Sequence, residues 1–140
     1  MKILLAVDGS PFTKRMLAYL TAHDEFPGLN HDYTVLTVVP AVPSRAAVAL
    51  DKSLLDNYYA DESERVLKPI RAFLGKQGLT AKYLFKIGHA ADAVTALAQK
   101  GKFDLLVMGS HGHGALTNLV MGSVATKVIA HCRIPVLLVR

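Results

Sequence analysis

The chain has 140 residues and a mass of 15.1 kDa, with 51% apolar and 19% charged side chains and a formal net charge of +5 at pH 7. This size and composition suit one folded domain over residues 1–140 and exclude an intrinsically disordered chain. The single cysteine excludes a disulfide framework, and the apolar runs are too short for a secretory leader or a membrane-spanning helix, so we expect a soluble cytoplasmic protein with no membrane partner.

The first third of the chain predicts a strand, a helix and a second strand. Lys2–Val7 is a near-continuous apolar run, which is typical of a strand in a sheet that is covered on both faces. Ser10 and Pro11 then supply an N-cap and a first helical residue, and apolar side chains at three- and four-residue steps extend the helix over 11–23. Tyr33–Val39 is rich in β-branched residues and predicts the second strand.

The middle third predicts a loop, a long helix and an edge strand. Pro40–Leu50 contains two prolines and several small residues, and we interpret it as a loop. A broad apolar face recurs from 51 to 76, and Pro69 is expected to kink or divide this helix. In Ala81–Ile87 lysines interrupt the apolar pattern, which favours a strand at the edge of a sheet because exposed lysines discourage edge-to-edge pairing.

The last third predicts a helix over 90–99, a buried strand over Phe103–Met108, a helix over Ser123–His131 and a strand over Pro135–Val139. Strands that alternate with helices predict parallel βαβ units, wound right-handedly into a three-layer α/β sandwich. In such folds ligands bind beyond the carboxyl ends of the strands. We therefore expect the functional residues directly after the first and fourth strands.

The surplus of positive charge is concentrated in the middle of the sequence. Residues 65–102 contain eight basic side chains and one acidic side chain, whereas residues 105–140 contain no aspartate or glutamate. A nucleic-acid-binding protein usually gathers basic and aromatic side chains on one face. Here the basic residues are spread over a predicted helix, strand and loop, so we interpret them as a solvated surface and expect no nucleic-acid partner.

Residues 108–124, which read MGSHGHGALTNLVMGSV, are typical of a phosphate-binding segment. Glycines after a strand let a ligand approach the backbone, and Gly122 and Ser123 precede a helix whose first amides favour an anion. The Ser123 hydroxyl can cap that helix or donate to a phosphate oxygen. The pattern predicts a site made mainly of backbone donors, and an ordinary glycine-rich turn is the alternative.

The spacing of these glycines resembles a known signature. Gly109-x-x-Gly112, then nine residues, then Gly122-Ser123 is similar to the ATP-binding signature of the universal stress protein family, and KILLAVDGS, FDLLVMGSHG and GSVATKVIAHCRIPVLLVR resemble that family in the same order. The resemblance covers the whole chain. It implies an α/β fold of the adenine nucleotide alpha hydrolase-like type, with a five-stranded parallel sheet in the order 3-2-1-4-5. It also implies a homodimer through the last strand, from Pro135 to Val139.

The same resemblance implies a ligand and a set of binding residues. The ligand would be ATP, AMP or ADP, with or without Mg²⁺ on its phosphates, and the protein would act in the stress response. Asp8 would lie near the ribose or adenine, and Val38 would face the adenine. His113 stands where many nucleotide-binding relatives carry arginine or lysine, which leaves the nucleotide preference open. The implied site comprises Ala6, Val7, Asp8, Val38, Met108, Gly109, Ser110, His111, Gly112, His113, Gly114, Gly122, Ser123 and Val124.

Other chemistry is less well supported by the sequence. His111 and His113 could form half of a transition-metal site, but no obvious third ligand lies beside them. Cys132 is interpreted as a small buried hydrophobe rather than a reactive thiol. No carboxylate lies between Gly109 and Ser123 to act as a base, so any ATP hydrolysis should be slow. We predict a nucleotide-dependent binding or signalling module, with a non-nucleotide structural dimer and a slow ATPase as alternatives.

Overall fold

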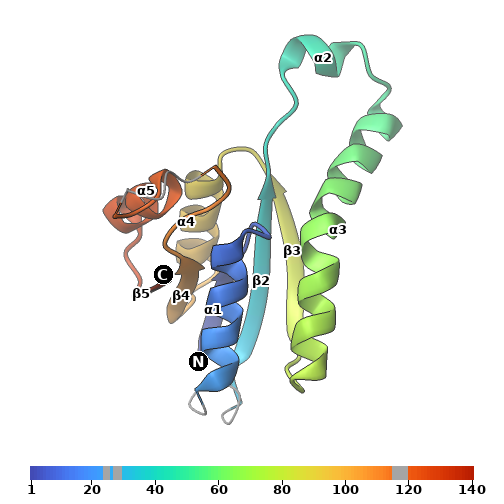
Figure 1. Cartoon of the computed structure of the whole chain (residues 1–140). Coiled ribbons are helices and arrows are strands. Elements are labelled where there is room, and N and C mark those ends of the chain that lie inside the picture. The colour runs from blue at the N-terminus through green and yellow to red at the C-terminus, as the bar shows by residue number, and fades with distance from the viewer. Residues whose placement is uncertain (24–25, 27–29, 115–119) are drawn as a thin grey trace.

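The computed structural model describes residues 1–23, 26, 30–114 and 120–140. Within these residues a sheet of five parallel strands has the order β3-β2-β1-β4-β5, which confirms the fold and the strand order that were predicted (Figure 1). The strands are β1 (Lys2–Ala6), β2 (Asp32–Val39), β3 (Ala81–Ile87), β4 (Leu105–Gly109) and β5 (Val136–Val139).

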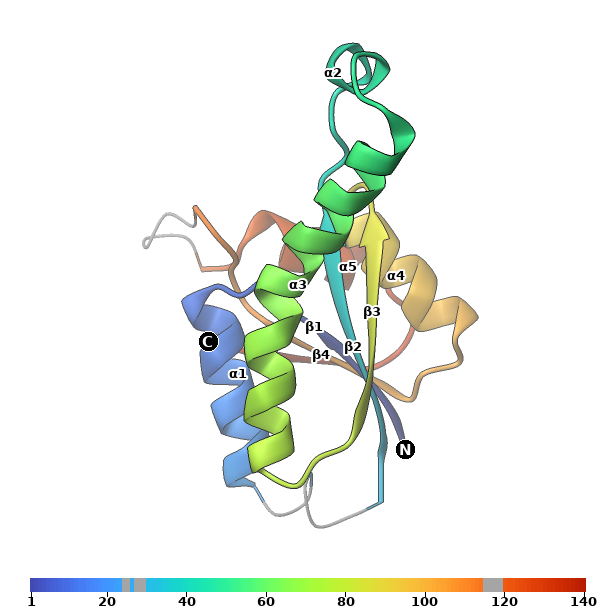
Figure 2. The ribbon, with the colours of Figure 1, turned by 90° about the vertical axis from the view of Figure 1, so that its right-hand side faces the viewer.

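Helices cover both faces of the sheet. α1 (Pro11–Ala22) and α3 (Lys52–Lys76) pack on one face, and α4 (Ala90–Lys100) and α5 (Ser123–His131) pack on the other, as Figure 2 shows from the side. Each face has its own apolar core, because successive side chains of a strand point to opposite faces. The result is the three-layer sandwich expected from alternating strands and helices.

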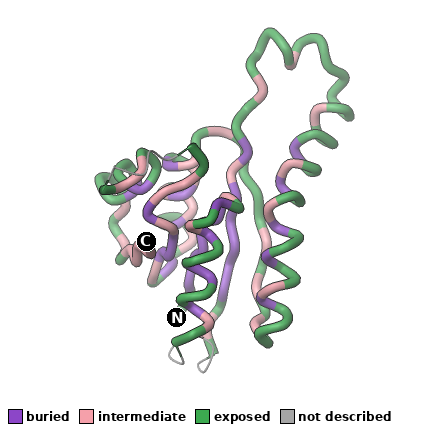
Figure 3. The backbone as a smooth tube through the Cα atoms, viewed as in Figure 1, coloured by how far each residue is buried: buried purple, intermediate pink, exposed green. Residues whose placement is uncertain are grey.

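Burial within the sheet follows the strand order. Apart from Lys2, the residues of the central strand β1 are all buried, whereas none of the residues of β3 and β5, at the two edges, is fully buried (Figure 3). Lys82 and Lys86 of β3 are exposed. This confirms the prediction that the half-polar strand lies at an edge, where water can solvate its ammonium groups.

Most helix and strand boundaries lie within two residues of the predicted ones, but the segment between β2 and α3 differs. Pro40–Leu50, predicted as a loop, contains the short helix α2 (Ser44–Val48). Its first turn forms because Pro43 O accepts hydrogen bonds from the N–H groups of Ala46 and Ala47, both at 2.9 Å. Tyr59 Oη accepts from the N–H of Val42 at 2.9 Å, which ties the start of this segment to α3.

Pro69 does not divide α3, so of the two predicted outcomes, a kink or a division, the division is wrong. The helix runs from Lys52 to Lys76 with Pro69 inside it. A proline removes one backbone hydrogen bond, but on both sides of it Leu67, Ile70 and Leu74 are buried in the core. Tertiary packing of an apolar face contributes more to a helix in a protein than the propensity of one residue. The first turns of α3, together with α2, extend beyond the sheet (Figure 1).

Among the described residues no helix is both long enough and apolar enough to span a membrane.

Candidate functional site

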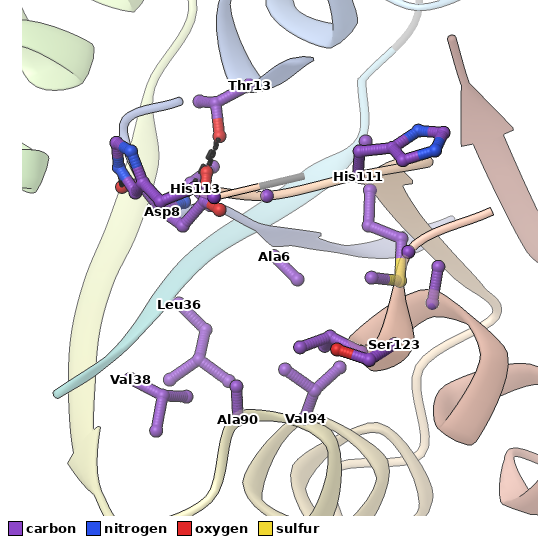
Figure 4. Close-up of a pocket in the computed structure, with 18 residues that line it drawn as sticks. Ala6, Asp8, Thr13, Leu36, Val38, Ala90, Val94, His111, His113 and Ser123 are labelled. Carbon is purple, nitrogen blue, oxygen red and sulfur yellow. Dashed lines mark hydrogen bonds between the residues drawn. The ribbon is translucent and has the colours of Figure 1, made fainter. Parts of the chain in front are cut away.

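A cavity of about 390 Å³ lies at the carboxyl ends of β1, β2 and β4, between the glycine-rich segment and the first turns of α4 and α5 (Figure 4). This volume is in the range of small-molecule binding sites. The lining residues are Ala6, Val7, Asp8, Thr13, Leu36, Val38, Ala90, Val94, Met108, Gly109, His111, Gly112, His113, Gly114, Gly122, Ser123, Val124 and Ala125.

One side of the cavity is apolar. Leu36 and Val38 reach it from β2, and Ala90 and Val94 reach it from α4, where they are one helical turn apart (Figure 4). Ala6 completes this side from β1. A planar, weakly polar group such as a nucleobase fits a wall of this composition, because its burial removes apolar surface from water on both partners.

The opposite side of the cavity is polar and is organised around Asp8. Its Oδ1 accepts hydrogen bonds from the Thr13 hydroxyl at 2.8 Å and from the N–H of Ser10 at 2.9 Å. The N–H of Asp8 donates to Thr13 Oγ1 at 3.1 Å. His113 Nε2 lies 2.7 Å from the backbone oxygen of Asp8 and must be the donor, since a carbonyl only accepts. The two hydrogen bonds to Oδ1 fix the carboxylate in the lining of the cavity.

The three glycines of the signature stand where the chain comes close to other groups. A Cβ on Gly109 would lie 2.7 Å from Phe12 Cβ, and a Cβ on Gly112 would lie 2.5 Å from Asp8 Oδ2. A Cβ on Gly122 would lie 3.1 Å from His111 Cα. The spacing that was noticed in the sequence therefore reflects three separate close approaches around one cavity.

Two backbone hydrogen bonds fix the ends of the glycine-rich segment. The N–H of Ser110 donates to the oxygen of Val139 at 2.8 Å, and the N–H of Gly122 donates to the oxygen of Ser110 at 2.8 Å. The N-cap of α5 is Gly122, with no side-chain cap, so Ser123 is the first helical residue and does not cap the helix. The first turn of α5 faces the cavity, where its partial positive charge favours an anion.

Every site residue that was proposed from the sequence lines the cavity, except Ser110. Ser110 is 2% exposed, and its Oγ lies 2.8 Å from His111 Nδ1, so its side chain is not part of the lining.

Among the described residues no group of three histidine, cysteine, aspartate or glutamate side chains could hold a metal ion. Cys132 is half-buried against the core on the α4 and α5 face. Residues 115–119 of the glycine-rich segment lie outside the described residues.

Five lining residues were not found from the sequence, namely Thr13, Leu36, Ala90, Val94 and Ala125. Leu36 could have been found, because it is two residues from Val38 on one strand and so shares its face. Thr13 also carries a signal, since it follows the N-cap Ser10 by three residues and lies in the first turn of a helix that begins at the site. Ala90 and Val94 give no such signal, because small apolar residues on a helix are usually core residues.

The comparison with known protein families agrees with this geometry. The model of the universal stress protein family matches residues 1–140. The chain belongs to the universal stress protein family.

Individual relatives cover nearly the whole chain. A universal stress protein of Thermus aquaticus is 34% identical over 138 residues, which are 99% of this chain and 97% of the relative. The universal stress protein Slr1230 of Synechocystis is 29% identical over 99% of this chain, but the match spans only 42% of that longer protein. In Slr1230, therefore, the matched part makes up less than half of the protein.

Solved structures share the fold. The structure of protein MJ0577, of Methanocaldococcus jannaschii, superposes with a TM-score of 0.81 at 27% identity and covers 99% of this chain and 94% of its own. A universal stress protein of Arabidopsis thaliana, solved with AMP bound, has a TM-score of 0.70 at 16% identity, with 99% and 90% of the two chains covered.

Proposed function

We propose that this universal stress protein binds an adenine nucleotide in the cavity at the carboxyl ends of β1, β2 and β4. The observation that carries the proposal is the division of one cavity into an apolar wall and a helix N-terminus. The wall, with Leu36, Val38 and Val94, suits a base, and the first turn of α5 suits a phosphate. The AMP-bound relative from Arabidopsis supports the same ligand class.

We further propose that the nucleotide makes the protein a conditional binding or signalling module in the stress response, working as a homodimer in the cytoplasm. The sequence resemblance implies ATP, AMP or ADP as the ligand, and the choice among these three nucleotides is part of the proposal. Hydrolysis is not included. Asp8 is the carboxylate among the described lining residues, and its Oδ1 already accepts hydrogen bonds from Thr13 and Ser10.

Two substitutions, one at each end of the cavity, test nucleotide binding. Gly122→Val places a branched side chain against His111 Cα and Ser110 O, at the phosphate end. Ala90→Phe fills the apolar end from the half-buried first residue of α4. We expect each to weaken AMP and ATP binding in titration calorimetry by about tenfold or more, because each removes space that the ligand needs.

The matched control is Ala96→Phe, which adds the same side chain at an exposed position of α4 outside this cavity. It should leave the affinity unchanged. Thermal melting of each variant separates a lost site from a lost fold. Undiminished binding by folded Gly122→Val and Ala90→Phe proteins would show that the nucleotide does not occupy this cavity.

A further inference from the structure

The described lining of the cavity contains no lysine or arginine. Its ionisable side chains are Asp8, His111 and His113. Residues 115–119 add no charge, because their sequence is ALTNL. Arg15 of α1 does not line the cavity and instead lies with its guanidinium 5.1 Å from the centroid of the Phe12 ring. Any phosphate in this site is therefore bound without a permanently cationic side chain from the described lining.

The negative charge of Asp8 lies beside the segment that would hold the phosphates. Its Oδ2 is 2.5 Å from the position of a Cβ on Gly112, while its Oδ1 is fixed by Thr13 and Ser10. Because Thr13 is 3% exposed and the N–H of Ser10 belongs to the turn before α1, the carboxylate cannot easily rotate away. A second or third phosphate added along the glycine-rich segment would add negative charge near a fixed negative charge.

The compensating positive charge is small. The N-terminus of a helix is equivalent to about half an elementary charge. An imidazole contributes at most one positive charge, and only when both of its nitrogens carry protons. His113 already directs Nε2 to the backbone oxygen of Asp8, and His111 Nδ1 lies 2.8 Å from Ser110 Oγ. A nucleoside monophosphate carries about two negative charges at neutral pH and a triphosphate about four, so the mismatch grows with each phosphate.

We propose that this site selects nucleoside monophosphates over triphosphates and that Asp8 determines the selection. The inference rests on the proposed function, since it ranks ligands for the same cavity. The apolar wall faces the base, which AMP, ADP and ATP share, so it does not rank these nucleotides, and the ranking is expected from the charges beside the phosphates. This preference for monophosphates differs from the ATP binding that the glycine spacing implies.

The test is titration calorimetry of the whole chain with adenosine, AMP, ADP and ATP, at fixed ionic strength and without divalent cations. We expect AMP to bind more tightly than ADP and ADP more tightly than ATP, by roughly three- to tenfold for each added phosphate at partly screened distances. Mg²⁺ should narrow the gap between AMP and ATP, because it neutralises charge on the triphosphate.

The substitution Asp8→Asn isolates the cause. It retains an oxygen that can accept from Thr13 and Ser10 but removes the charge, so the ratio of AMP to ATP affinity should fall to within about threefold. The ratio is the readout because any loss of ribose contacts affects both nucleotides. Asp32→Asn is the matched control. Asp32 is an exposed residue at the amino end of β2, the opposite end of the sheet, and its substitution should leave the ratio unchanged.

The outcomes separate the two proposals. ATP binding as tight as AMP binding, or a ratio that Asp8→Asn does not change, would overturn charge selection while nucleotide binding itself stands. Absence of binding by adenosine and all three nucleotides would overturn both proposals. A ratio that changes in Asp8→Asn but not in Asp32→Asn supports the role of Asp8.

Discussion

At the scale of single residues, the glycines of this chain stand in very different surroundings. A Cβ on Gly109 would approach Phe12 Cβ to 2.7 Å and the Phe12 carbonyl carbon to 3.2 Å, so β4 and the first turn of α1 could not keep their present distance. A Cβ on Gly75, in the last turn of α3, would meet nothing within 4 Å. The two positions therefore make a matched pair for the same substitution.

We expect Gly109→Ala to lower the free energy of unfolding by about 1–3 kcal/mol, as overpacking against backbone does. Gly75→Ala should raise it by about 0.5–1 kcal/mol, because alanine loses less conformational entropy than glycine on entering a helix. Urea unfolding of both variants measures the difference. Equal effects of the two substitutions would contradict the packing that is assigned to Gly109.

At the scale of elements, Arg71 of α3 forms an exposed ion pair with Glu64 of the same helix and also contacts Tyr83 of β3. Glu64 accepts hydrogen bonds from both terminal nitrogens of Arg71 at 3.1 Å, and the Arg71 guanidinium lies 4.8 Å from the centroid of the Tyr83 ring. The hydrogen bonds from Arg71 lower the pKa of Glu64 below its ordinary value of 4.5. A lowered pKa means that folding favours the ionised carboxylate.

The contribution of Glu64 to stability should therefore be present above the ordinary pKa of glutamate and disappear as the pH falls through the lowered pKa. The wild-type protein should have a slightly higher melting temperature than Glu64→Gln at about pH 7, and the two melting temperatures should converge at about pH 3. The difference should be small and should shrink in high salt, because the two side chains are 50% and 45% exposed. A difference that grows on acidification would contradict this sign.

At the scale of the whole molecule, β5 is an edge strand of the sheet, and in the described part of the chain no further strand pairs with its outer side. The N–H of Leu106 donates to the oxygen of Pro135, and the N–H of Ser110 donates to the oxygen of Val139. Alternate residues of β5 therefore direct their backbone groups toward β4. Val136 therefore directs its N–H to the open edge. The side chains of β5 are half-buried apolar groups, which suits the proposed pairing of β5 with the same strand of a second copy.

We expect light scattering over a concentration series to show a dimer, and Val136→Pro to weaken it by about tenfold or more, because proline lacks the edge N–H yet leaves the bonds to β4 in place. The matched control is Ile87→Pro on the opposite edge. Gly88 donates to the oxygen of Val39, so the N–H of Ile87 faces away from β2. This control should leave the dimer unchanged, whereas equal effects of the two prolines would exclude pairing through β5.

The alternation of strands and helices and the glycine-rich segment could both be predicted from the sequence alone, because both depend on short-range patterns. Apolar runs, a capping serine and β-branched residues act within a few positions of the chain. These patterns could not decide whether Pro69 breaks α3 or whether α2 forms. Around Pro69 the core residues Leu67, Ile70 and Leu74 are buried. α2 begins with hydrogen bonds to Pro43 O, in a segment whose start is joined to α3 by the hydrogen bond between Val42 and Tyr59.

The surroundings of the cavity became visible only in the tertiary structure. Parallel strands end at one edge of the sheet, so Asp8 comes to lie beside Gly112 although more than a hundred residues separate them. The same geometry brings Leu36 of β2 and Val94 of α4 into one apolar wall, and leaves the lysines and arginines of the sequence outside the described lining of the cavity. The composition gives a net charge of +5, but only the three-dimensional structure shows that no lysine or arginine belongs to the described lining of the cavity.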